Sequence, residues 1–169
     1  MSEINHLAEV LEGHFTNPKP SSFIHYVVVS DGLTGAQAAQ VPGERFNSIW
    51  SVSNHMAFWL EYTRTALVDE EIDLAVWGMT EIGNGWPPLG EISDTNWLAA
   101  RQRALDSCRA LTAAVRTLDE ARLEEPSEKL FGGKPYQAIL AMYGHNCHHT
   151  AEILTIRHIL GLWIDHEWA

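Results

Sequence analysis

The amino-acid sequence predicts an all-α protein whose helices pack as a bundle. Three long segments repeat apolar residues at every third or fourth position, which is the spacing of one helix face. Clusters of proline and glycine separate these segments, and no apolar runs pair convincingly as strands. Amphipathic helices without a sheet bury their apolar faces against one another. We therefore expect a helical bundle that forms one domain over residues 1–169.

The first expected element is a short amphipathic helix from about Glu3 to Gly13, where the glycine ends it. A break at 17–20 follows, and a second helix is expected through 23–28. Ser21 or Ser22 would cap this helix. The valine run at 27–29 keeps a strand open as the alternative, because β-branched residues favour strands.

A short helical turn is expected from Thr34 to Gln40, capped by Thr34. A long helix then begins near Asn47 or Ser48 and runs to about Val68, with His55 at the edge of its inner face. The inner face consists of Ile49, Val52, Met56, Trp59, Leu60, Thr63 and Leu67.

The segment 69–92 is a connector rich in glycine and proline, too irregular for a core element and long for a plain loop. Such loops often border a functional site. Asp94 or Thr95 would cap a third long helix, which ends near Leu118. Its inner face consists of Leu98, Leu105, Cys108, Leu111, Thr112 and Val115.

A loop at 124–133 leads into the final helix, which we expect over 135–163 with Pro135 in its first turn. At about 100° per residue, His145, His149 and Glu152 fall on the apolar face of this helix. The apolar members of that face are Ala138, Met142, Ile153, Ile156, Leu160 and Trp163.

The composition limits the classes of function. The formal net charge of −11 argues against a nucleic-acid partner, because binding a phosphate backbone needs a basic surface. Only two cysteines occur and no secretory signal pattern opens the chain, so we expect a reducing, cytoplasmic setting. No apolar stretch reaches the roughly 18–20 residues of a membrane span, and no membrane association is expected.

The inward histidines predict a metal site. Burying unpaired polar groups costs a few kcal/mol each, so His145, His149 and Glu152 need partners. Two histidines four residues apart lie about 6 Å apart at Cβ and can converge on one ion. His55 is the other histidine placed within a long core helix, which makes His55, His145 and His149 the simplest ligand set. The alternative is a cluster of core histidines that binds no metal and forms hydrogen bonds with backbone carbonyls.

Other polar residues receive lesser roles. Glu152 would orient a ligand as a hydrogen-bond acceptor, act as an acid or base near a bound water, or lie partly exposed. His148 is assigned to the pocket edge or an interface, and His25 to packing or the surface, with pocket lining as its alternative. Trp86 is a candidate to cover a pocket. Asn146 follows the first histidine where a zinc protease needs glutamate, so peptide hydrolysis has no support. Neither Cys108 nor Cys147 is expected to be a ligand.

Three stretches resemble the DinB/YfiT-like superfamily, and the likeness covers nearly the whole chain. They are the segment 46–59 (FNSIWSVSNHMAFW), the segment 84–88 (NGWPP) and the segment 145–153 (HNCHHTAEI). The resemblance implies a four-helix bundle, here with a short extra N-terminal helix and a long Gly/Pro-rich connector. It also implies a divalent ion, zinc or nickel, held by His55, His145 and His149. Many members have Gly-Gln where this chain has Ala151-Glu152.

Characterised members include thiol S-transferases that use bacillithiol or mycothiol, and a mycothiol-dependent isomerase. The resemblance therefore implies a metal-dependent enzyme that activates a low-molecular-weight thiol or water for attack on a small-molecule substrate. The alternative is a non-catalytic, metal-stabilised bundle or a small-molecule binding or sensing protein. We also expect a homodimer, from the resemblance and from the seven tryptophans.

Overall fold

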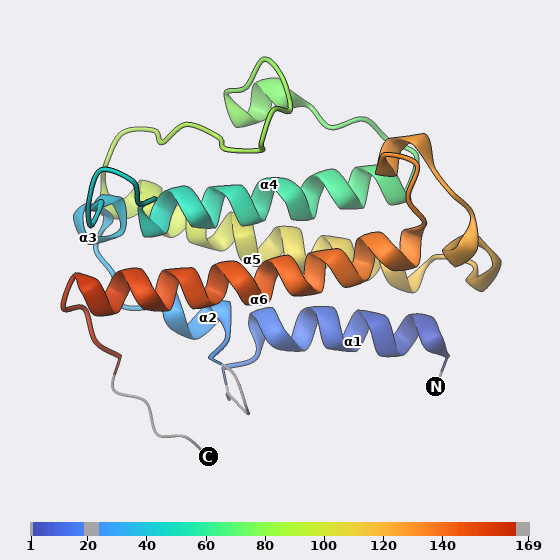
Figure 1. The fold of residues 1–169 in the computed structure, drawn as a ribbon, viewed down its shortest axis with the longest axis horizontal. Coiled ribbons are helices and arrows are strands. Elements are labelled where there is room, and N and C mark those ends of the chain that lie inside the picture. The colour runs from blue at the N-terminus through green and yellow to red at the C-terminus, as the bar shows by residue number, and fades with distance from the viewer. Residues whose placement is uncertain (1, 19–23, 165–169) are drawn as a thin grey trace.

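The computed structural model describes residues 2–18 and 24–164, and it confirms an all-α fold. Four long helices lie side by side, and α1 and α4 each contact both α5 and α6 (Figure 1). This arrangement is a four-helix bundle around one apolar core. The helices are α1 (Glu3–Thr16), α2 (Tyr26–Val29), α3 (Gly35–Ala39), α4 (Ile49–Leu67), α5 (Asp94–Arg116) and α6 (Pro135–Ile159). The 3₁₀ turns are η1 (Leu74–Trp77), η2 (Glu120–Glu124) and η3 (Glu128–Leu130).

Helix α1 is a full member of the bundle, so the prediction of a short extra helix ending at Gly13 was wrong. The helix continues through Gly13 to Thr16, and Phe15 is fully buried, stacked on Tyr26 with ring centroids 4.4 Å apart. A glycine inside a helix costs about 1 kcal/mol. Burying a phenylalanine side chain contributes about 1.5–3 kcal/mol, which outweighs that cost.

The second helix is a single turn, α2, and its N-cap is His25. Ile24 lies outside it, and the expected caps Ser21 and Ser22 lie outside the described residues. The strand alternative was wrong, since the described residues contain no strand. Two arginines bind the carbonyls around this turn: Arg101 donates to Val27 O, and Arg157 donates to Val29 O and Asp31 O. Helix α3 has the expected Thr34 cap.

Helix α4 begins at Ile49 with Ser48 as its cap, close to the expected start near Asn47 or Ser48. Its predicted inner face is buried except for Trp59, which is only partly buried. The connector crosses over α4 and contains η1 (Figure 1).

Helix α5 is capped by Ser93, not by Asp94 or Thr95, and ends at Arg116. Asp94 instead accepts a hydrogen bond from Gly35 N at 2.7 Å, which ties α5 to α3. Leu98 is 57% exposed, contrary to prediction, because the neighbouring Trp97 occupies the core.

Helix α6 ends at Ile159, four residues before the predicted end. Gly161 has a positive φ of 72°, and the chain leaves the helix there. Trp163 is consequently exposed, stacked on His158, although we expected it on the inner face.

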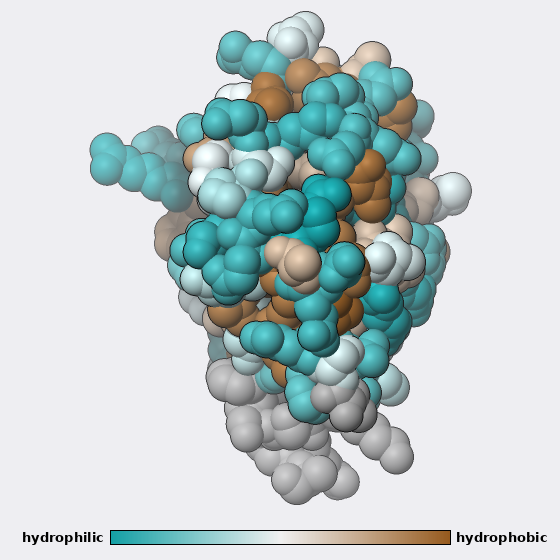
Figure 2. All heavy atoms as spheres, turned by 90° about the vertical axis from the view of Figure 1, so that its right-hand side faces the viewer, coloured by the Kyte–Doolittle hydropathy of each residue, from teal (hydrophilic) through white to brown (hydrophobic). Residues whose placement is uncertain are grey.

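The end of the bundle shown in Figure 2 is mostly hydrophilic, with hydrophobic side chains in small groups between polar ones. Among the helices described, none is long and apolar enough to span a bilayer.

Candidate metal centre

The structure brings His55, His145 and His149 together between α4 and α6. One ring nitrogen from each lies within 4.8 Å of those of the other two. The Nε2 atoms of His55 and His145 are 3.1 Å apart. Ninety residues separate these two histidines in the chain, and the packing of α4 against α6 joins them. The cluster is compatible with binding a divalent metal ion.

A backbone carbonyl fixes the ring of His55. Its Nδ1 lies 2.7 Å from Gly85 O, and because a carbonyl only accepts, Nδ1 carries the proton. In the neutral ring, Nε2 then keeps a free lone pair directed at the cluster. Trp86 stacks on the same ring, with centroids 3.9 Å apart and planes 13° apart. Trp86, which we expected to cover a pocket, therefore covers His55.

Glycine is required at position 85 for this contact. Its φ is +68°, a conformation in which other residues are strained. A Cβ atom there would overlap the indole of Trp59 and approach Phe58 Cδ1 to 2.8 Å. The sequence motif containing Gly85 was recognised as part of the family resemblance, but its carbonyl contact with His55 was not foreseen.

A carboxylate fixes the ring of His149. Nδ1 of His149 donates to Glu152 Oε2 at 2.6 Å, and Asn47 Nδ2 donates to Oε1 of the same carboxylate at 3.1 Å. The hydrogen bond from His149, supported by the one from Asn47, lowers the pKa of Glu152 and keeps it ionised. The bond leaves Nε2 of His149 as the free nitrogen. A carboxylate that holds the far nitrogen of a histidine is a typical partner of metal ligands.

His145 completes the cluster without such an acceptor. Its Nδ1 is buried and has no hydrogen-bond partner among the described residues. Burial, followed by the nearby His149 and His55, lowers its pKa to about 3. Burial also lowers the pKa of His55 to about 4. Both rings are therefore neutral near pH 7, the state that a metal ligand requires, and the donor set fits a zinc-like ion.

A second group of possible ligands lies on α6 alone, formed by His148, His149 and Glu152. His148 is exposed, and both oxygens of Glu152 already accept hydrogen bonds. The geometry therefore favours the cluster shared by two helices.

The remaining candidates lie elsewhere. His25 is buried and its Nδ1 contacts Asn17 O at 2.9 Å, which agrees with a packing role. Cys108 is fully buried, and burial raises its pKa to about 12. Cys147 is half-buried on α6, and neither cysteine belongs to the metal-compatible cluster.

An apolar groove of about 270 Å³ lies between α4 and α6. Trp59, one turn after His55, and Met142, one turn before His145, both line it. Its outer wall includes Phe131, which is 73% exposed, has a φ of +55° and stacks on Tyr62. The groove was not predicted from the sequence. Trp59 lies four residues after His55 and Met142 three residues before His145, and this spacing places both on the helix faces that carry the histidines.

The fold and the site together define a class: helical-bundle proteins with a three-histidine cluster compatible with a divalent metal. A family model described as the DinB superfamily matches residues 26–169, and the chain belongs to this superfamily. The match begins at α2 and includes all three histidines. No match was found among curated proteins or among solved structures.

Proposed function

We propose that this protein is a metal-dependent enzyme that uses His55, His145 and His149 to bind one divalent ion, with zinc expected first and nickel second. The observation that carries the proposal is the convergence of three histidine rings, with one ring nitrogen of each within 4.8 Å of the others and two of the rings oriented by an outer hydrogen bond. Three protein ligands are typical of catalytic zinc, whereas structural zinc usually has four.

When bound, a divalent ion lowers the pKa of a coordinated thiol or water and so supplies a nucleophile. The residues around the histidines orient and shield the ligands. Gly85 O and Glu152 accept hydrogen bonds from Nδ1 of His55 and His149, so that both rings present Nε2 to the cluster. Trp86 shields one face of His55 from water. Orientation before the reaction spares the cost of rearrangement during it.

The apolar groove supports a substrate with an apolar body. Trp59, Tyr62 and Met142 line it, and almost all of its surface is apolar. We propose that an electrophile lies there and that a low-molecular-weight thiol, or water, attacks it from the side of the histidines. The new bond to sulfur or oxygen replaces the bond to a leaving group, which departs with the bonding electrons. This is thiol transfer or, with water, hydrolysis. A homodimer remains part of the proposal, and a monomer mass in light scattering at micromolar concentration would refute that part.

The metal is tested by plasma mass spectrometry of tag-free protein. We expect about one zinc or nickel per chain, because the described part of the chain offers one set of three histidine ligands, and we expect the ion to be lost in both His55→Ala and His145→Ala. His148→Ala is the matched control on the same helix and should keep the metal. No metal in the wild type, even after incubation with divalent ions, would refute the proposal.

Catalysis is tested separately with His149→Ala and a panel of thiols and electrophiles. Loss of turnover with little change in stability supports an enzyme. A large loss of stability in a protein that shows no turnover even in the wild type would favour a metal-stabilised bundle instead.

A further inference from the structure

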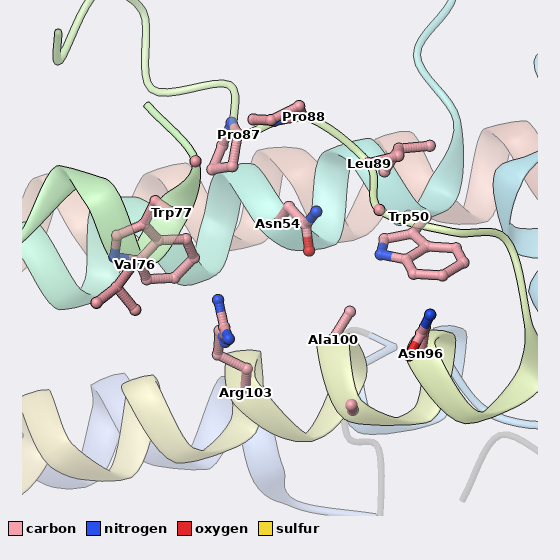
Figure 3. Close-up of a pocket in the computed structure, with 13 residues that line it drawn as sticks. Trp50, Asn54, Val76, Trp77, Pro87, Pro88, Leu89, Asn96, Ala100 and Arg103 are labelled. Carbon is pink, nitrogen blue, oxygen red and sulfur yellow. The ribbon is translucent and has the colours of Figure 1, made fainter. Parts of the chain in front are cut away.

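A second cavity, of about 390 Å³, lies on a different face of α4 from the histidines. It is bounded by α4, by α5 and by the connector, which passes over it (Figure 3). None of the three histidines lines it. The connector separates the two sites, because Trp86 stacks on His55 whereas the next residues, Pro87 and Pro88, line the cavity.

Hydrogen-bonding groups without partners face this cavity. Asn54 from α4 and Arg103 from α5 point toward each other across it (Figure 3). Trp50 turns the nitrogen edge of its indole toward the same space (Figure 3). Within residues 2–18 and 24–164, these three side chains make no hydrogen bond and no ion pair. The guanidinium carbon of Arg103 lies over the ring of Trp77, 5.0 Å from the centroid.

Arg103 is the one charged residue among the described residues that line the cavity, although the chain is acidic. No carboxylate is among its described lining residues. The two carboxylates near Arg103 on its other side pair with other arginines: Glu61 with Arg64 at 2.9 Å and Asp106 with Arg109 at 3.0 Å. In a protein with 22 acidic and 11 basic residues, an arginine without an acidic partner at a cavity is an available anion receptor.

About half of the cavity surface is apolar, and flat side chains contribute to it. Trp50 and Trp77 lie toward its two ends, Pro87 and Pro88 form the roof, and Ala100 contributes a small side chain to the floor (Figure 3). Rings and prolines of this kind pack well against a planar hydrocarbon. Pockets that pair an apolar body with a few polar groups are typical of small-molecule sites.

We propose that this cavity binds a small carboxylate with a flat apolar body. Arg103 would bind the carboxylate in a bidentate manner, and the amide of Asn54 would donate the next hydrogen bond. The apolar body would lie between the indoles under the two prolines. This site is independent of the proposed metal chemistry, because it shares no residue with the cluster.

The test is calorimetric titration of the full chain with 1-naphthoate, with and without a metal chelator. We expect saturable binding of one molecule per chain in both cases, and much weaker binding of the uncharged analogue 1-naphthalenemethanol. Arg103→Gln should weaken naphthoate binding about tenfold or more, because it removes a charged hydrogen-bond donor. Arg116→Gln, the same change in the last turn of the same helix and outside the cavity, is the matched control and should bind as the wild type does. Ala100→Phe, which fills the cavity but keeps the charge, should also abolish binding.

Four results would overturn the proposal. The first is no saturable binding to the wild type, and the second is equal binding of the uncharged alcohol. The third is equal weakening by Arg116→Gln. The fourth is binding that disappears with chelator while Arg103→Gln has no effect. The last result would place the carboxylate at the histidines. Inorganic phosphate that competes as well as naphthoate would also contradict the role of the flat apolar body.

Discussion

The two sides of helix α4 carry two sites that are built in opposite ways. Toward α6, His55 and His149 each have one nitrogen already bonded, to Gly85 O and to Glu152. Toward α5, Asn54 and Arg103 face a cavity without hydrogen-bond or ion-pair partners among the described residues. The first site is oriented in advance, and the second offers groups that still need an acceptor.

The difference teaches how each site should respond to substitution. In the histidine site, the outer partners decide which nitrogen is free, so changing a partner disturbs the ligands without touching them. In the cavity, Asn54 and Arg103 have no outer partner among the described residues, so only the groups that face it should matter. The connector borders both sites, so substitutions next to it can show whether the sites are independent.

The largest effect is expected from Gly85→Ala. The new Cβ would overlap Trp59 and approach Phe58, and the positive φ would strain the backbone. We expect the free energy of unfolding to fall by about 2–4 kcal/mol in chemical denaturation. The metal should also be lost, since Gly85 O would leave His55. Gly90→Ala, in the same connector but with open space around it, should change little. Unchanged stability and metal content in Gly85→Ala would contradict the role given to this carbonyl.

The second effect concerns Glu152→Gln. The change removes the negative charge that His149 contacts but keeps the size of the side chain. We expect metal affinity to fall by about 10–100-fold, measured by competition with a chelator of known affinity. The fold should be retained, because Glu152 is only partly buried. Glu9→Gln on the exposed side of α1 carries the same charge change and should keep the metal. Equal affinities in both variants would remove Glu152 from the site.

The sequence predicted the parts of the molecule that follow helical periodicity. The inner faces of α4 and of most of α5 follow it, and so does the meeting of His55 with the α6 pair. The exceptions occur where one side chain outweighs a local signal. Phe15 carries α1 past Gly13, and Trp97 replaces Leu98 in the core.

Glu152, the outer partner on α6, was a candidate from the sequence. Gly85 and Asn47 were harder to predict, because they come from the irregular connector and from a loop before α4. Gly85 contributes a backbone carbonyl, which has no sequence signature of its own. The cavity at Arg103 depends on where Pro87 and Pro88 cross α4, and no periodicity in the sequence specifies that crossing. A contact made by an irregular segment therefore cannot be predicted from periodicity and is found only in the tertiary structure.

A third substitution, Asn54→Asp, tests whether the cavity and the metal site on the two sides of α4 respond independently. A carboxylate would then face Arg103 across the cavity and repel an incoming anion. We expect naphthoate binding to weaken about tenfold in calorimetric titration, as for loss of a charged contact. Metal content should not change, although Asn54 is next to His55 in the chain. Asn5→Asp, exposed on α1, adds the same charge elsewhere. Loss of metal in Asn54→Asp would show that the two faces are not independent.

The smallest effect is expected from Trp86→Leu, which keeps an apolar side chain but removes the ring stacked on His55. Stacking of this kind contributes about 0.5–1.5 kcal/mol, so metal affinity should fall by roughly threefold to tenfold. Gly85 O would still hold Nδ1 of His55, which is why the loss should stay below that of Glu152→Gln. Competition with a chelator, measured on both variants under the same conditions, shows which of them loses more metal affinity. A larger loss in Trp86→Leu would mean that the indole, rather than the hydrogen bonds, positions the histidines.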